Sequence, residues 1–316
     1  MTTATAPLPE LVAAPATHDW MPSSPCDSGC IGTDAETVGN TEFALRIAGA
    51  VALMATFPIA NTAARGKRRS AVQRRYARAL LGCCGVDLRI VDNRGTDTPG
   101  ARFAEPGEGV LVVCGHVGWT DVVALAAVQP VSFVARADLI DWPILGSLAR
   151  RMRVIPIDRA NLRKLPDVVA QIADRISAGE RIAAFPEGTT WCGRAYGNLR
   201  PALFQAALDT DTAVQPVRLQ YIGADGTLST TPAFVGDDSM AASLLRMLRS
   251  RGTTAEVVLA PVEQPGTDRK DLAARCARAV RGQVHLDFAD HGVLEPGQRR
   301  NTARQPVEAE PEICIA

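Results

Sequence analysis

The sequence has 316 residues and lacks several features that would assign it to a common class of protein. Its formal net charge is zero, which argues against a general nucleic-acid-binding protein, because such proteins carry an excess of basic groups. Its first residues have no basic start and no continuous apolar stretch, so they do not resemble a secretory signal. We expect a globular protein that does not bind nucleic acid and whose first residues are not a secretory signal.

Sequence signatures of metal sites and of nucleophilic hydrolases are also missing. The chain has no G-x-S-x-G, no Gly-rich phosphate loop and no H-E-x-x-H. Its eight cysteines include the adjacent Cys83 and Cys84, and Cys26 and Cys30 in a Pro/Ser/Gly-rich leader. No second pair supplies the spacing of zinc ligands. We therefore expect reduced thiols in the cytosol and neither a metal nor a cofactor.

What the sequence does contain divides into four parts. We predict a disordered leader over residues 1–40, a membrane-docking pair of helices over 41–85, an α/β domain over 86–291 and a flexible tail over 292–316. The tail is acidic near its end, whereas the region before the α/β domain is basic. Charge is therefore unevenly distributed although its sum is zero.

The first apolar stretch covers residues 43–61. Between Arg46 and Pro58 only eleven uncharged residues run without interruption, short of the roughly 20 that cross a bilayer. We expect an interfacial or half-inserted helix that Pro58 and Asn61 bring to an end.

Residues 65–78 carry basic side chains and no acidic one. They predict an amphipathic basic helix, closed by Gly85, that suits an anionic membrane surface. The alternative is an ordinary packed pair of helices with a solvated basic face, and this segment alone does not decide between the two.

From residue 86 onward, short β-rich runs alternate with helical stretches. The helical stretches include 160–178, with Pro166 near its first turn, and 268–284. This alternation predicts an α/β fold, in which a largely parallel mixed sheet is flanked by helices. The predicted strands lie at 86–92, 109–114, 131–135, 153–157, 181–185, 213–221 and 255–262.

His116 follows one of these runs, where α/β folds place their ligand crevices, and Asp121 lies five residues later. Positions five apart on a helix point about 140° away from each other, so the pair meets only if His116 lies in the loop and Asp121 in the first turn. Gly115 and Gly118 make such a turn possible. An aspartate bonded to Nδ1 would leave Nε2 as a base. Since the chain has no serine elbow, the proton would come from a hydroxyl of the substrate. The alternative is a hydrogen-bonded core histidine.

Four stretches in order carry a resemblance to a known family: HVGWTD (116–121), 133–159, FPEGTTW (185–191) and VQPV (214–217). They resemble the conserved blocks of the glycerolipid acyltransferases, the family of the 1-acylglycerol-3-phosphate acyltransferases. The resemblance implies an enzyme of phospholipid biosynthesis on the cytoplasmic face of the membrane, peripheral or monotopic. Such an enzyme moves a fatty acyl group from acyl-CoA or acyl carrier protein to the hydroxyl of a lysolipid. His116 and Asp121 would be its catalytic residues.

The same resemblance implies which residues bind the substrates. Arg136 and Arg159 follow strand-like runs and would hold an anionic head group through their planar guanidinium forks. Glu187 is assigned to the acceptor site, and Gly188 permits close approach of the backbone. Pro216 would shape the acyl-donor site. The alternatives are a salt bridge of Arg159 with its neighbour Asp158, a glutamate that opens a helix and a proline that bounds a strand.

One departure from the family pattern concerns the acceptor. Phosphate-acceptor members usually read E-G-T-R, where this chain has Glu187, Gly188, Thr189 and Thr190, with Arg194 four residues further on. The threonine form is similar to the ornithine-lipid branch. We place a phosphate-bearing lysolipid first as acceptor and a lyso-ornithine or other phosphate-free lysolipid second. The rival from another class is a catalytically silent lipid-binding module of the same fold.

Overall fold

A computed structural model describes residues 21–32, 35–95, 101–141 and 143–282. Each predicted β-rich run forms a strand in it, with ends that differ by at most three residues, so the α/β prediction is confirmed. The strands are β1 (Val86–Asp92), β2 (Val110–Cys114), β3 (Ser132–Arg136), β4 (Ile155–Ile157), β5 (Arg181–Ala184), β6 (Val214–Ile222) and β7 (Thr253–Leu259).

The strands form one seven-stranded sheet in the order β1-β7-β6-β2-β5-β3-β4. Neighbouring strands pair in parallel, except β6 and β7, which are antiparallel. The largely parallel mixed sheet is therefore as predicted. In the central strand β2, Val112 and Cys114 belong to the core on one face of the sheet, and Leu111 and Val113 to the core on the other. Both faces are covered, which explains why this run is continuously apolar.

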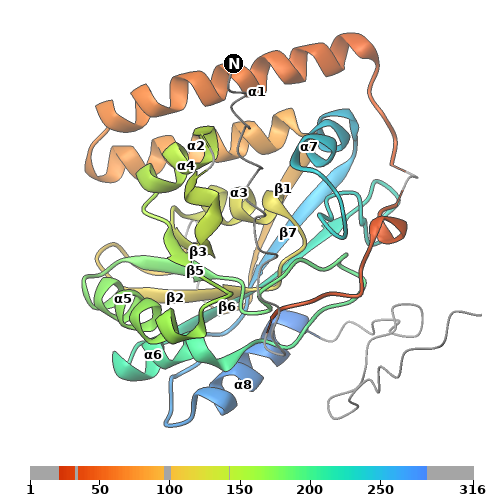
Figure 1. Cartoon of the computed structure of the whole chain (residues 1–316). Coiled ribbons are helices and arrows are strands. Elements are labelled where there is room, and N and C mark those ends of the chain that lie inside the picture. The colour runs from red at the N-terminus through yellow and green to blue at the C-terminus, as the bar shows by residue number, and fades with distance from the viewer. Residues whose placement is uncertain (1–20, 33–34, 96–100, 142, 283–316) are drawn as a thin grey trace, which may run out of the picture.

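Helices cover the two faces as two layers (Figure 1). Leu81, Leu125 and Met247 place α2, α3 and α7 on one core, whereas α5, α6 and α8 share the other. The helices are α1 (Asn40–Ala63), α2 (Gly66–Cys83), α3 (Trp119–Val128), α4 (Pro143–Arg151), α5 (Leu165–Ser177), α6 (Gln205–Asp209), α7 (Met240–Arg249) and α8 (Arg269–Arg281). Four short 3-10 turns are η1 (Ser28–Cys30), η2 (Ala137–Asp141), η3 (Leu162–Lys164) and η4 (Pro201–Phe204). The expected helices 160–178 and 268–284 correspond to α5 and α8, and the tail from 292 lies outside the described residues.

Helix α1 is longer than the sequence predicts. It runs through Pro58, ends at Ala63 and has 24 residues. By length and composition alone, such a helix could cross a membrane. The turn after Pro58 is held by α2: buried Asn61 accepts hydrogen bonds from Arg69 Nε at 3.2 Å and from Gln73 Nε2 at 3.0 Å. These contacts explain why the proline does not end the helix.

Helix α2 lies between α1 and α3, so α1 is the outermost layer on that side of the molecule (Figure 1). Arg78 Nε of α2 donates to the carbonyl of Ala127 in α3 at 3.2 Å. Gly85 follows α2 with a φ of 66°, so the predicted glycine closes this helix in the left-handed region. The basic segment is therefore a packed layer between an apolar helix and the α/β domain.

The leader is in part ordered, contrary to the prediction for residues 1–40. Residues 21–32 and 35–39 pack on the α/β domain, and Cys26 and Val38 are buried. Gly32 N donates to Thr230 Oγ1 at 2.7 Å, and Val38 N donates to the carbonyl of Arg249 at 2.9 Å. Contacts with residues some 200 positions away order a segment whose own composition suggests disorder.

Candidate active site

His116 and Asp121 meet where β2 gives way to α3. Strand β2 ends at Cys114, α3 begins at Trp119, and the imidazole lies in the loop between them. His116 Nδ1 lies 2.8 Å from Asp121 Oδ2. The spacing of loop histidine and first-turn aspartate thus gives the contact that the sequence predicts.

Asp121 is fully buried and held by four donors. Its Oδ2 also accepts the main-chain N–H groups of Val117 at 2.6 Å and Gly118 at 2.9 Å, and its Oδ1 accepts the hydroxyl of Tyr221 at 2.7 Å. Because the carboxylate only accepts, Nδ1 of His116 carries the proton and Nε2 keeps its lone pair. Burial, and next the charge of Asp121, raise the pKa of Tyr221 well above its usual range, so the phenol stays a donor.

Gly118 allows the fold-back of this loop through space rather than through its φ. A Cβ at this position would lie 2.5 Å from the carbonyl oxygen of Pro232. No side chain fits there without moving the backbone, so the loop requires a glycine.

The His116 ring is fixed by its neighbours. It stacks on Phe185 with ring centroids 4.0 Å apart and an interplanar angle of 11°. Its main-chain N–H donates to Glu187 Oε2 at 2.8 Å, and its carbonyl accepts the N–H of Trp191 at 2.7 Å. The imidazole is 18 % exposed, so solvent or a substrate reaches it. Such an arrangement orients the ring before any substrate binds.

Glu187 supports the loop of His116 and also lines a pocket beside it. It is buried, and its Oε1 accepts the N–H of Gly197 at 3.1 Å while Oε2 accepts that of His116. Burial raises its pKa to about 8, although the two main-chain donors and Arg281 favour the ionised form. The carboxyl group therefore joins the β2 and β5 loops.

A pocket lies beside this loop, beyond the carboxyl end of β2. Two arginines that the sequence motifs did not identify, Arg218 of β6 and Arg281 of α8, contribute to its wall. Arg281 Nη2 donates to the carbonyl of Gly197 at 2.9 Å. The other wall residues that matter here are His116, Glu187, Tyr196 and Leu219.

Arg136 and Arg159 do not line this pocket; within the part of the chain that the structure describes, they form a second positive region. Burial, followed by the charge of Arg136 and then that of Arg200, lowers the pKa of Arg159 to about 10, against the opposing charge of Asp138. Arg136 pairs with Asp138 at 2.6 Å. The structure thus adds Arg200 to the two predicted arginines, a residue outside the family blocks.

Asp158, which the sequence offered as an alternative salt-bridge partner of Arg159, forms an ion pair with Lys164. Asp158 Oδ2 lies 3.3 Å from Lys164 Nζ.

Gly188 adjoins this second positive region. Its φ is 78°, and a Cβ there would lie 2.7 Å from Pro22 Cγ and 3.7 Å from Arg200 Nε. Both the backbone conformation and the space require glycine. The turn at the end of β5 therefore lies against the leader on one side and a guanidinium group on the other.

Thr190 turns its hydroxyl to the main chain, where it donates to the carbonyl of Phe234. Thr189 is half-buried in the same turn, and the Arg194 side chain is exposed. Thr190 thus takes the place of the family arginine without presenting its hydroxyl to an open site.

Pro216 lies inside β6 opposite Val113 of β2 and is buried. Its carbonyl accepts Gln215 Nε2 at 2.8 Å and Ala260 N at 3.2 Å. It belongs to the interior of the sheet, not to the described wall of the pocket.

Comparison with known proteins agrees with this geometry. Residues 96–220 match the acyltransferase family. A lyso-ornithine lipid O-acyltransferase from Pseudomonas aeruginosa is 33% identical over 199 residues, covering 63% of this chain and 74% of that protein. A 1-acyl-sn-glycerol-3-phosphate acyltransferase from Neisseria gonorrhoeae is 29% identical over 196 residues, covering 61% of this chain and 76% of that protein.

A solved structure shares the fold. The crystal structure of a 1-acyl-sn-glycerophosphate acyltransferase from Thermotoga maritima matches with a TM-score of 0.52 at 14% identity, covering 75% of this chain and 95% of that one. The fold, the matched family region and the relatives agree with one another, and we conclude that the chain is an O-acyltransferase that belongs to the acyltransferase family.

Proposed function

We propose that this enzyme transfers a fatty acyl group from a thioester, acyl-CoA or acyl carrier protein, to the hydroxyl of a lysolipid during phospholipid synthesis. The observation that carries the proposal is the His116–Asp121 pair, in which the aspartate holds the Nδ1 proton and leaves Nε2 available. The described residues that line the pocket around this base include no serine, threonine or cysteine, which suits direct attack by a substrate hydroxyl. The names of the relatives support the same class of acceptor.

In the proposed reaction, His116 Nε2 takes the proton of the acceptor hydroxyl while the oxygen attacks the thioester carbonyl. A new C–O bond forms, and the tetrahedral intermediate then expels the thiolate as the C–S bond breaks. The imidazolium returns its proton to the leaving sulfur. Asp121 stabilises the imidazolium through the 2.8 Å contact and does not itself exchange a proton.

The second positive region favours a phosphate-bearing lysolipid as the acceptor. Burial, followed by the positive charges of Arg136 and Arg200, lowers the pKa of Arg159 to about 10. A phosphate group would neutralise this mutual repulsion and accept paired hydrogen bonds from the guanidinium groups. Gly188 would bring the turn after β5 close to such a head group.

A phosphate-free acceptor, such as a lyso-ornithine lipid, is the second candidate. Two observations favour it: the relative from Pseudomonas aeruginosa carries that name, and Thr190 stands where phosphate-acceptor members have arginine. Arg136 is already paired with Asp138, which leaves less net charge for a dianionic phosphate.

Attachment to the membrane surface is part of the proposal. Leu45, Val51, Met54 and Ile59 are each more than half exposed on α1. Because α1 packs along α2, which in turn packs on α3, the apolar helix is held as a layer of the domain (Figure 1). We propose that it lies in the interface on the cytoplasmic face, with the basic groups of α2 near anionic lipid head groups.

A direct assay tests the function. The full chain in vesicles is given one acyl-CoA and, separately, 1-acylglycerol-3-phosphate or a lyso-ornithine lipid, and acylated product is measured by mass spectrometry. We expect product with the unmutated chain and a loss of about 10²–10⁴-fold in His116→Ala, the usual effect of removing a general base.

The assay also separates the candidates. Higher kcat/KM with the phosphate acceptor supports the first candidate, and the reverse order supports the second. A folded chain that binds both lipids and acylates neither, with acyl-CoA or with acyl carrier protein, would be the silent lipid-binding module instead.

A further inference from the structure

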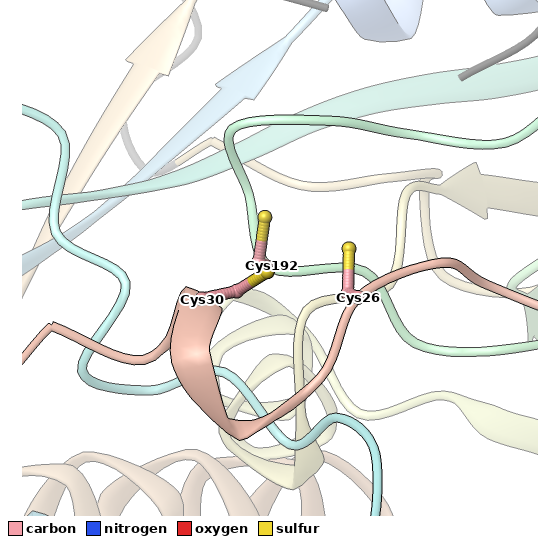
Figure 2. Close-up of side chains that lie close together, drawn as sticks. All are labelled: Cys26, Cys30 and Cys192. Atoms are coloured by element: carbon pink, nitrogen blue, oxygen red, sulfur yellow. The ribbon is translucent and has the colours of Figure 1, made fainter. Parts of the chain in front are cut away.

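Three cysteines from two distant segments converge beside the active-site turn. Cys26 and Cys30 come from the leader, and Cys192 comes from the loop that follows Thr190 (Figure 2). Their sulfur atoms all lie within 4.8 Å of one another. Cys26 and Cys192 are buried, and Cys30 is half-buried. In the sequence, Cys26 and Cys30 have no further cysteine at the spacing of a metal ligand. Folding brings Cys192 to them from a distant segment.

A short 3-10 turn of the leader brings Cys30 near Cys26. The 3-10 turn η1 begins after Asp27, whose side chain accepts Gly29 N at 2.9 Å. Cys30 N closes the turn on the carbonyl of Asp27 at 3.1 Å. Gly236 lies beneath this turn, where a Cβ would come within 3.0 Å of Asp27 Cα. The turn is therefore seated on the domain and does not hang free.

The surroundings of Cys192 suit a thiolate bound to a cation. Its sulfur accepts the main-chain N–H groups of Arg194 and Ala195, and both bonds favour the negative form. Its thiol also forms a hydrogen bond with Cys26, so the two sulfur atoms lie side by side. A metal ion would displace the protons of these thiols when it binds.

We propose that Cys26, Cys30 and Cys192 bind a Zn²⁺ ion that fastens the leader to the active-site loop. Zinc–sulfur bonds of about 2.3 Å in a tetrahedral site place the sulfurs roughly 3.8 Å apart, a small contraction of the arrangement present here. Thiolates select soft or borderline ions over Mg²⁺ and Ca²⁺. Binding releases three protons, and no electron is transferred.

The fourth position of the zinc ion is open to water or to Asp27. Asp27 Oδ1 lies 3.9 Å from Cys30 Sγ and would reach the ion after a rotation that breaks its bond to Gly29. Three thiolates with one oxygen ligand still satisfy tetrahedral zinc.

The proposed ion would act on the site through the leader. Pro22 lies against Gly188, and Gly32 binds Thr230, so the zinc would clamp the leader between these two contacts. The clamp would hold Trp191, whose N–H binds the His116 carbonyl, through its neighbour Cys192. This role is structural, and it does not depend on which lysolipid the enzyme acylates.

Metal content and cobalt substitution test the proposal. The full chain is purified without added metal, and its zinc is measured by elemental mass spectrometry. The chain is then reduced, stripped with a chelator and titrated with Co²⁺, whose thiolate complexes give charge-transfer absorption. We expect about one zinc per chain, the cobalt absorption, and at least a tenfold weaker affinity in Cys30→Ser, because ligand loss weakens a site by at least that much. Cys83→Ser, which changes a half-buried cysteine of α2, is the matched control.

The contrary outcomes are distinct. The proposal is overturned if the reduced unmutated chain binds neither zinc nor cobalt, or if Cys30→Ser and Cys83→Ser bind equally. It is also overturned if intact-mass measurement shows a disulfide between two of these cysteines in the purified chain. The charge-transfer absorption of the unmutated chain with Co²⁺ tests metal binding even if a variant unfolds. Because no acyl transfer is measured, failure here leaves the proposed function untouched.

Discussion

Tyr221 and Asp121 are joined by a 2.7 Å hydrogen bond between residues 100 positions apart. The tyrosine is buried on β6, and its hydroxyl meets the carboxylate oxygen opposite the one that faces His116. We therefore expect it to act on the imidazole through Asp121, as a positioning residue. Asp121 belongs to the first family block, whereas Tyr221 lies outside all four blocks.

Tyr221→Phe should lower turnover while leaving the fold in place. Asp121 would lose one of its donors inside the core, which costs about 1–3 kcal/mol of the free energy of unfolding. We expect kcat to fall by about tenfold with little change in KM, less than the loss in His116→Ala. Steady-state kinetics and denaturant unfolding check both figures. Tyr76→Phe, which removes a hydroxyl 3.2 Å from Thr56 on the helix pair, is the control and should keep normal kcat. Equal kcat in the two variants would remove Tyr221 from the mechanism.

Arg159→Gln should weaken use of a phosphate-bearing acceptor. If the second positive region binds phosphate, losing a guanidinium that forms charge-assisted bonds costs about 1.5–3 kcal/mol, or roughly 10–150-fold in kcat/KM. A phosphate-free acceptor should lose much less. Arg194→Gln, an exposed arginine after the same turn, should change neither value. A matching loss for both acceptors in Arg159→Gln would show that this region does not bind the head group.

Glu187 should make stability depend on pH. Burial raises its pKa in the folded state from 4.5 to about 8, so the folded chain keeps the proton after the unfolded chain has released it. Its contribution is fully present below about pH 4.5 and is lost as the pH rises towards 8, with a slope of at most about 1.4 kcal/mol per pH unit. Unfolding in denaturant between pH 5 and 8 measures this slope, which should be flatter in Glu187→Gln. Glu105→Gln, an exposed carboxylate, should retain it. An unchanged slope in Glu187→Gln would mean that Glu187 is ionised throughout.

Membrane attachment should depend on the exposed face of α1. Replacing Leu45, Val51, Met54 and Ile59 together by serine removes apolar side chains worth about 1.5–3 kcal/mol each when buried. We expect sedimentation with anionic vesicles to fall by more than tenfold while the circular dichroism stays the same. Leu162→Ser with Val262→Ser, exposed apolar residues outside α1, serves as the control. Undiminished sedimentation of the α1 variant would place the membrane contact elsewhere.

Much of the fold was predictable because local patterns determine it. Each apolar run from 86 onward became a strand, and the loop at His116 met the first turn at Asp121 as its spacing required. The end of α1 was not predictable, because Asn61 is held by side chains of α2. The tendency of proline to end a helix was applied to the sequence of α1 alone, and it takes no account of contacts with α2.

The parts of the site that were missed are those assembled by distant segments. Arg200 and Tyr221 carry no local motif, and they reach the site only through the packing of the sheet and its loops. The third cysteine, Cys192, follows the same rule. The sequence placed Thr190 in the motif after a predicted strand, but it could not predict the direction of the side chain, which the carbonyl of Phe234 determines.

The contact between Pro22 and Gly188 has a practical consequence for protein engineering. Position 188 has no room for a side chain while the proline is in place, so the two positions constrain each other sterically. A chimera that joins residues 86–282 of this chain to the amino-terminal region of a relative would keep Gly188 but replace the segment that contains Pro22. Segment swaps within this family should therefore carry residues 21–39 together with the α/β domain.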